Sequence, residues 1–256
     1  MIDFVGAGPG AEDLITLRGM RLLEKADVVI YAGSLVNPGL LSYAPEGAEI
    51  HNSAELTLEE VTEIMTEADR KGLRVVRLHT GDQSLYGAVR EQMDILDERG
   101  IAYSSCPGVS AAFGAAAALD MEYTLPGVSQ TLIITRMEGR TAVPEKESIE
   151  LLAAHGSSMA VYLSAGMLKG LSERLMEGGY SADTPAAIVY KATWPEEKKL
   201  LCTVGTLYET GEEHGISRTA VVLIGEAVTH SSYERSKLYD PGFTTGYRKG
   251  KDGIKG

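Results

Sequence analysis

Short apolar runs and amphipathic stretches alternate along the first half of the chain. The runs at 2–5, 28–31 and 73–78 have the length and composition of buried strands. Stretches with helical periodicity follow the first and third of these runs, and after the second a short strand comes before the next helix. This βαβ order predicts a parallel sheet covered by helices on both faces. The expected strands are 2–5, 28–31, 49–51, 73–78 and 101–105, and the expected helices are 16–23, 57–68, 89–96 and 109–119.

The periodic pattern breaks at 121–127, which contains a Pro-Gly turn. We therefore expect an N-terminal α/β domain over 1–119 and a C-terminal α/β domain over 120–256. The turn-like stretch 194–197 lies between two strand patterns, so the second sheet is predicted to be mixed. After about residue 230 the chain becomes a polar tail. The second half is expected to contain strands at 131–134, 158–163, 186–190, 199–202 and 220–224, with helices at 166–176 and around 207.

Two glycine-rich turns come directly after predicted strands. Residues 6–10 follow the first strand, and 80–87 follow the strand at 73–78 with one carboxylate, Asp82. Because ligands bind at the carboxyl edge of open parallel sheets, both turns should reach one small-molecule site.

Composition narrows the function classes. The 256 residues are 44% hydrophobic and 23% charged, as in a globular protein that stays in solution. The net charge of −12 argues against binding to nucleic acid or an anionic membrane. Cys106 and Cys202 form neither a disulfide framework nor a metal-ligand pattern, which favours a cytoplasmic location. No run approaches the about 20 apolar residues of a membrane span, and the start does not resemble a signal peptide.

A nucleotide-binding module is the alternative class. Gly6, Gly8 and Ala11 fit the dinucleotide fingerprint, which is weak evidence alone. The fold needs an acid after the second strand, where this chain has 31–34 without one. The loop before Thr16 is also long for a phosphate site, and no P-loop lysine follows the glycines.

The motifs together resemble the tetrapyrrole (corrin/porphyrin) methylases, over nearly the whole chain. Residues 5–10 with 14–19 resemble the family's N-terminal signature, 80–82 its S-adenosylmethionine-binding loop, and 107–111 its third motif. The resemblance implies two α/β domains with an active-site cleft between them, the tetrapyrrole methylase fold. It also implies a homodimer, a tetrapyrrole substrate, S-adenosyl-L-methionine as methyl donor and S-adenosyl-L-homocysteine as product, with no metal.

Within the family, four stretches resemble the branch that methylates C11 of precorrin-4 or cobalt-precorrin-4 in cobalamin biosynthesis. They are 31–36, 79–82, 135–141 and 190–198. A tetrapyrrole methylase acting at another ring position is the nearer alternative; relatives that methylate RNA or a modified histidine are less compatible with the acidic charge and these stretches. Gln83 stands where the family usually has proline, Glu55 where it has glycine, and Lys191 where it has arginine.

The resemblance implies roles for individual residues. Asp82 and His79 are the catalytic candidates. The expected cofactor-binding residues are Pro9, Thr80, Gly81, Asp82, Leu85, Ser110, Ala111, Leu163, Ala192 and Ala220. The candidates for the substrate carboxylates are Arg136, Arg140, Lys191 and Arg218.

Simpler interpretations stay open for these side chains. Asp82 could cap a helix that starts near Ser84. His79, at a strand end, could be an ordinary buried histidine. Arg136 and Arg140 could be solvated loop charges.

Overall fold

The computed structural model describes residues 1–229 and 233–251, and the chain divides into two compact units. One unit contains 1–115 together with 191–198, and the other contains 116–190 and 199–256. The predicted division into an N-terminal domain over 1–119 and a C-terminal domain over 120–256 stays a prediction. Of the predicted tail, 230–232 and 252–256 lie outside the described residues. No helix in the described part of the chain is long and apolar enough to cross a membrane.

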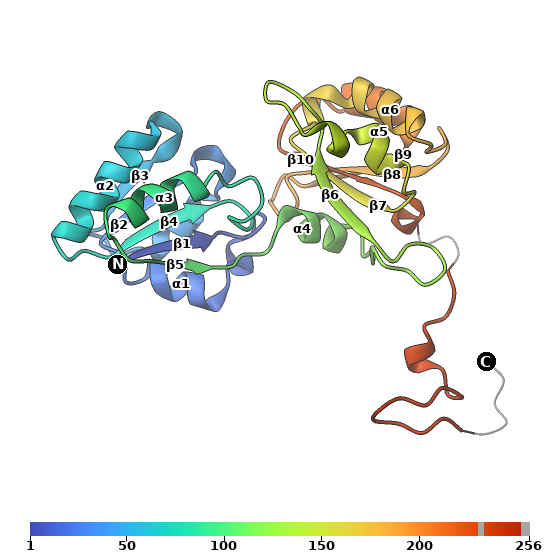
Figure 1. Cartoon of the computed structure of the whole chain (residues 1–256), viewed down its shortest axis with the longest axis horizontal. Helices are drawn as coiled ribbons and strands as arrows, with labels where there is room; N and C mark the ends of the chain where they lie inside the picture. The colour runs from blue at the N-terminus through green and yellow to red at the C-terminus, as the bar shows by residue number, and fades with distance from the viewer. Residues whose placement is uncertain (230–232, 252–256) are drawn as a thin grey trace. The chain divides into compact units, whose positions relative to one another are not determined.

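The first unit contains a parallel sheet in the strand order β3-β2-β4-β1-β5 (Figure 1). Helices α2 and α3 pack on one face around Phe4 and Ile30, and α1 packs on the other around Val5 and Val29. The predicted parallel sheet with helices on both faces is confirmed. The elements are β1 (Ile2–Gly6), α1 (Leu17–Leu23), β2 (Val28–Tyr31), β3 (Glu49–Asn52), α2 (Leu58–Arg70), β4 (Val75–His79), α3 (Arg90–Glu98), β5 (Tyr103–Cys106) and α4 (Ala111–Ala118).

The second unit contains a mixed sheet in the order β6-β7-β10-β8-β9. Strand β6 pairs with β7 in parallel, whereas β10 is antiparallel to both β7 and β8. Helices α5, α6 and α7 pack on one face around Met159, Ile188 and Leu171. The predicted mixed sheet is confirmed. The elements are β6 (Leu132–Arg136), α5 (Ile149–Ala153), β7 (Ser158–Tyr162), α6 (Leu168–Glu177), β8 (Pro185–Tyr190), β9 (Lys198–Thr203), α7 (Leu207–Glu213) and β10 (Ala220–Ile224).

Two strands start later than the apolar pattern predicts. The backbone N–H of Leu73 donates to Ala68 and that of Ile101 donates to Leu96, at 2.9 Å each. Both bonds close the end of the preceding helix, where the intervening glycine has positive φ. The first apolar residue of each run therefore belongs to a helix end, and β4 and β5 begin two residues later.

Candidate active site

Three loops meet at the carboxyl edge of the first sheet, because β4, β1 and β5 are adjacent and parallel. Gly8 and Gly81 pair through their backbones, with N···O distances of 3.2 and 2.8 Å. The loop after β5 joins them, since the backbone N–H of Gly108 donates to Asp82 Oδ2 at 2.8 Å. The two glycine-rich turns predicted to reach one edge do so.

Close backbone approach explains the glycine at 108. A Cβ atom there would lie 2.1 Å from the carbonyl oxygen of Gly81 and 2.7 Å from Cα of Gly6. Any side chain would push the loops apart. Part of the glycine pattern thus serves packing between the loops, before any ligand is considered.

Asp82 uses both carboxylate oxygens to shape these loops. Oδ1 accepts hydrogen bonds from the backbone N–H of Ser84 at 2.9 Å and from its hydroxyl, while Oδ2 accepts from Gly108. Burial raises the pKa of Asp82, but the hydrogen bonds from Ser84 and Gly108 lower it by more, so the net pKa is below its ordinary value. The interpretation that Asp82 caps a helix is wrong, because α3 begins at Arg90 and residues 83–86 are turns.

Ser110 and Ala111 lie beside Gly81 at the start of α4. The backbone N of Ala111 would be 3.5 Å, and Cα of Ser110 3.6 Å, from a Cβ atom on Gly81. The carbonyl of Ser110 accepts from the N–H groups of Phe113 and Gly114 and so begins the helix. Small residues thus surround Gly81, and the backbone of Ser110 and Ala111 lies close to it at this edge of the sheet.

A segment distant in sequence fastens the first glycine-rich loop. Trp194 Nε1 donates to the carbonyl of Pro9 at 3.1 Å, and the hydroxyl of Thr193 accepts from the N–H of Ala11 at 3.0 Å. Lys191 lies 3.5 Å from a carboxylate oxygen of Glu196, and its ammonium lies 5.1 Å from the centroid of the Trp194 ring. We call residues 191–196 the latch.

His79 is buried on the last position of β4, with its ring stacked on Phe4 at a centroid distance of 6.4 Å. Burial, and secondarily the positive charge of Arg77, lowers the pKa of His79 to about 3. Its Nε2 atom has no hydrogen-bond partner among the described residues. At neutral pH His79 is therefore an uncharged, buried ring.

Arg77 is buried two residues earlier on the same face of the sheet. It donates to Gln92 Oε1 at 3.1 Å and to the carbonyl of Ile30 at 3.2 Å, which ties β4 to α3 and β2. Burial lowers its pKa to about 10, so it stays charged at pH 7. Sequence reasoning assigned Arg77 no role, although an arginine inside an apolar strand run is itself the signal of a buried polar contact.

In the second unit, strand register brings predicted site residues to one sheet edge. Arg136 ends β6 opposite Tyr162, and Ala220 begins β10 opposite Tyr190. Leu163 follows β7 directly, and because β10 runs antiparallel to β7, it lies at the same edge. Leu163 is 65% exposed and has φ 53°. An exposed leucine in a left-handed conformation is typical of a functional position.

The four basic side chains predicted to bind the substrate carboxylates differ in their surroundings. Arg136 donates to the carbonyls of Thr141 and Ala142 at 3.1 and 2.8 Å and so holds its own loop. Arg140 and Arg218 are exposed. Lys191 belongs to the latch in the first unit. Substrate binding by these four residues stays a prediction.

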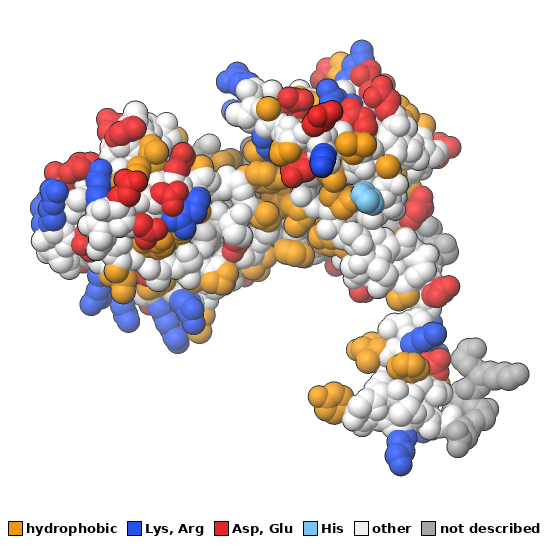
Figure 2. All heavy atoms as spheres, viewed as in Figure 1, with side chains coloured by type: hydrophobic (Ala, Val, Ile, Leu, Met, Phe, Trp, Pro, Cys, Tyr) orange, Lys and Arg blue, Asp and Glu red, His pale blue; other side chains and the backbone are white. Residues whose placement is uncertain are grey.

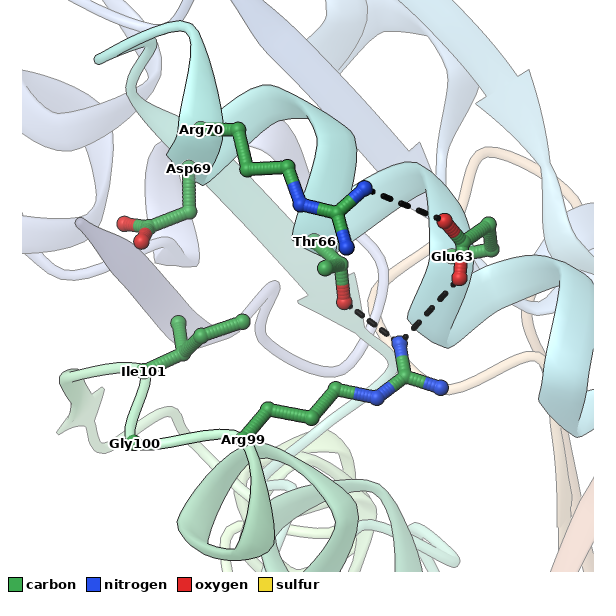
Figure 3. A pocket seen from close by; sticks show the side chains of 7 residues that line it. All are labelled: Glu63, Thr66, Asp69, Arg70, Arg99, Gly100 and Ile101. Atoms are coloured by element: carbon green, nitrogen blue, oxygen red, sulfur yellow. Dashed lines mark hydrogen bonds and ion pairs between the residues drawn. The ribbon is translucent and has the colours of Figure 1, made fainter.

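Two polar hollows lie in the first unit. One, of about 530 Å³, adjoins the first glycine-rich loop and is lined by Ala11, Glu12, Asp13, Asn37, Tyr43 and the latch. The other, of about 540 Å³, lies near the ends of α2 and α3, at the opposite edge of the sheet (Figure 3). There Arg99 donates to Glu63 and Thr66, and Arg70 points to Glu63. None of the predicted site residues lines this second hollow.

Comparison with known proteins decides the family. The model of the Tetrapyrrole (Corrin/Porphyrin) Methylases matches residues 1–208. A cobalt-precorrin-4 C(11)-methyltransferase of Methanocaldococcus jannaschii is 50% identical over 97% of this chain and 96% of its own. This chain belongs to the tetrapyrrole methylases. The predicted family is confirmed.

Solved structures of other tetrapyrrole methylases have the same fold. The X-ray structure of a cobalt precorrin-4 methyltransferase matches with a TM-score of 0.87 and 44% identity, over 89% of this chain and 95% of that one. The uroporphyrin-III C-methyltransferase of Thermus thermophilus, in complex with S-adenosylhomocysteine, matches with a TM-score of 0.75 and 25% identity. It covers 89% of this chain and 98% of its own. The predicted fold class of two α/β sheets is confirmed.

The methylase gathers its predicted cofactor residues in two groups. The loops of the first unit carry Pro9, Thr80, Gly81, Asp82, Leu85, Ser110, Ala111 and Ala192. The edge of the second sheet carries Leu163 and Ala220. Sequence reasoning missed the hydrogen bonds of Thr193 and Trp194 to the loop at 9–11, although it marked their stretch as a family feature.

Proposed function

We propose that this chain transfers a methyl group from S-adenosylmethionine to C11 of precorrin-4 or cobalt-precorrin-4 during synthesis of the corrin ring. The observation that carries the proposal is the meeting of three small-residue loops around Gly81 and Asp82, in a chain of this family. The half-identical relative is named for the same reaction. We also propose that the chain works as a homodimer in the cytoplasm.

S-adenosylmethionine supplies a methyl group on a sulfonium that is already activated for displacement by a ring carbon. The residues present fit this donor, because Gly81, Ser110 and Ala111 are small and lie close together, so that a ligand can approach the backbone. The exposed side chain of Leu163 offers an apolar surface suited to a flat base. The chain then has to bind and align its ligands, and alignment alone can lower the barrier by up to roughly 7–11 kcal/mol.

Asp82 and His79 have different parts in this proposal. Asp82 is a positioning residue, because its oxygens hold Ser84 and Gly108 in place. His79 is buried and uncharged and supports the end of β4 below the loop. Displacement at a sulfonium needs no general base at the attacking step, so neither side chain has to take a proton there.

The substrate is a polycarboxylate macrocycle, which a chain of net charge −12 has to bind against its own charge. We propose Arg136, Arg140, Lys191 and Arg218 as local cations for its carboxylates. Replacing exposed Arg140 with glutamine should raise the substrate KM and leave the affinity for S-adenosylhomocysteine unchanged.

The deciding assay mixes the enzyme, a labelled methyl donor and precorrin-4, prepared with and without cobalt. NMR of the product then locates the new methyl group. Label at C11 is the expected result, and the faster of the two intermediates identifies the preferred substrate. A methyl group at another ring position would keep the family and overturn the proposed position. No transfer to either tetrapyrrole would overturn the function.

A further inference from the structure

The C-terminal segment 233–251 has a charge opposite to that of the rest of the chain. It contains five Lys and Arg residues and two acids, Glu234 and Asp240, in a protein of net charge −12. No ion pair joins any of the five cations to an acid in the described part of the chain. The segment is therefore a basic surface with uncompensated charge.

Hydrogen bonds within the segment give it a defined shape. The guanidinium of Arg248 donates to the carbonyls of Leu238 and Asp240, at 3.1 and 2.5 Å. The N–H of Lys251 donates to the carbonyl of Pro241 at 2.8 Å. These bonds close the chain into a loop, coloured red in Figure 1.

The loop exposes its aromatic side chains. Tyr239 is 71% and Tyr247 fully exposed, and Phe243 and Leu238 are also exposed. Figure 2 shows apolar and Lys/Arg side chains together on this segment. Such residues usually pack in a core or against a ligand or partner.

We propose that segment 233–251 is a capture arm for the tetrapyrrole substrate, an inference that rests on the proposed function. Flat aromatic rings stack on a macrocycle, and Lys and Arg side chains pair with its carboxylates. Arg248 holds the loop together, which leaves four other cations for the carboxylates: Arg235, Lys237, Lys249 and Lys251.

Charge favours this ligand over a purely apolar partner. The remainder of the chain repels a polycarboxylate, whereas the arm attracts it and raises its concentration near the protein. The pairing of exposed rings with exposed cations matches the two chemical features of the substrate, its flat face and its acidic rim.

The test is a fluorescence titration of the full chain with an octacarboxylate porphyrin, a stable probe for this ligand class. One variant, R235Q/K237Q/K249Q, removes three charges, and another, Y239A/Y247A, removes two rings. R21Q/K25Q/K71Q is the matched control, since it removes one arginine and two lysines that are exposed in the first unit. S-adenosylhomocysteine affinity is measured in parallel to report the state of the fold.

Each arm variant should bind the porphyrin about fivefold more weakly than the unaltered chain. Each exposed contact contributes little free energy, so the loss of two or three of them together gives a modest effect. The control should bind like the unaltered chain, and all variants should keep their S-adenosylhomocysteine affinity. Added salt should reduce the difference between R235Q/K237Q/K249Q and the unaltered chain.

Other results separate the two proposals. Equal porphyrin affinity in the unaltered chain and both arm variants would overturn the arm and leave the proposed function standing. No porphyrin binding by any form, together with no methyl transfer to a tetrapyrrole, would overturn both. Loss of self-association in the arm variants, seen by light scattering with porphyrin affinity unchanged, would make the segment a contact between copies and overturn the arm.

Discussion

A single carboxylate connects two of the three loops at the candidate site. Asp82 binds Ser84 through one oxygen and the Gly108 backbone through the other, so removing it frees both partners at once. A loop carboxylate after a strand could be recognised in the sequence. Its partner Gly108 could not, because 26 residues separate the two and no local pattern reports that contact.

Replacing Asp82 with alanine should lower S-adenosylhomocysteine affinity at least about tenfold and lower stability by about 1–3 kcal/mol, because the N–H of Gly108 loses its partner. Calorimetry and urea unfolding measure the two effects. Ser84→Ala is the control, since it removes only the hydroxyl bond and should have a smaller effect. Lost turnover with unchanged cofactor affinity would instead assign Asp82 to the chemical step.

His79 should make stability depend on pH in acid. Its pKa is about 3 in the folded chain against an ordinary 6.5, so the unfolded chain binds one more proton between these values. Stability is then highest above pH 6.5 and falls as the pH drops toward 3, by about 1.4 kcal/mol per pH unit from this group.

His79→Phe removes this titration and keeps an aromatic ring beside Phe4. The difference in unfolding free energy between variant and unaltered chain should change with this slope below pH 6.5. Turnover at neutral pH should fall less than in Asp82→Ala. A larger loss of turnover would show that His79 acts on a proton in the reaction.

Among the elements, the sequence predicted strands and helices well and their connections poorly. The capping box of Thr57 and Glu60 predicts the start of α2, and the structure has both bonds. By contrast, Leu73 and Ile101 look like strand residues but complete helix ends. Periodicity shows which side chains are buried. A leucine or isoleucine is buried both in a strand and at the end of a helix, so the pattern does not distinguish the two.

The loop between β5 and α4 should not tolerate a side chain at 108. Gly108→Ala would place a methyl group against the carbonyl of Gly81, and backbone cannot move aside as a flexible side chain can. S-adenosylhomocysteine affinity should fall at least about tenfold, a loss of roughly 1.4 kcal/mol. Gly47→Ala, which meets nothing within 4 Å, should have no effect. Normal binding by Gly108→Ala would show that the loop packing is looser than the structure indicates.

Trp194 should contribute one of the two hydrogen bonds between the latch and the loop at 9–11. Trp194→Phe keeps an aromatic ring under Lys191 but loses the donor to the Pro9 carbonyl, at a cost of about 1 kcal/mol. Cofactor affinity should fall a few-fold in calorimetry. Tyr208→Phe, on an exposed face of α7, is the control. An unchanged affinity in Trp194→Phe would mean that the loop at 9–11 holds its shape without the latch.

At the scale of the whole molecule, the two series of strands and helices were visible in the sequence, and the latch was not. The Thr193–Ala11 bond joins residues 182 positions apart. A contact at that separation depends on how strands are ordered in both sheets. The composition showed that a chain of net charge −12 has to bind a polycarboxylate substrate. It could not show that residues 233–251 form a loop with exposed aromatic rings.

Ligand specificity should also appear in the stability of the whole chain. S-adenosylhomocysteine at 100 times its dissociation constant should stabilise the protein by about 2.7 kcal/mol, which corresponds to roughly 5–10 °C in Tm. NAD and ATP should give no shift. A shift with NAD and none with the adenosyl compound would favour the nucleotide-binding alternative.

The latch also sets the order in which the chain can finish folding during synthesis. The first sheet is complete once residue 106 has been made, and its helices can pack at that stage. The loop at 9–11 nevertheless lacks its two fastening bonds until Trp194 leaves the ribosome. In a nascent chain the first sheet can therefore be complete while the loop at 9–11 still lacks its hydrogen bonds to the latch. We expect ligand binding to appear only late in translation, after the latch has been synthesised.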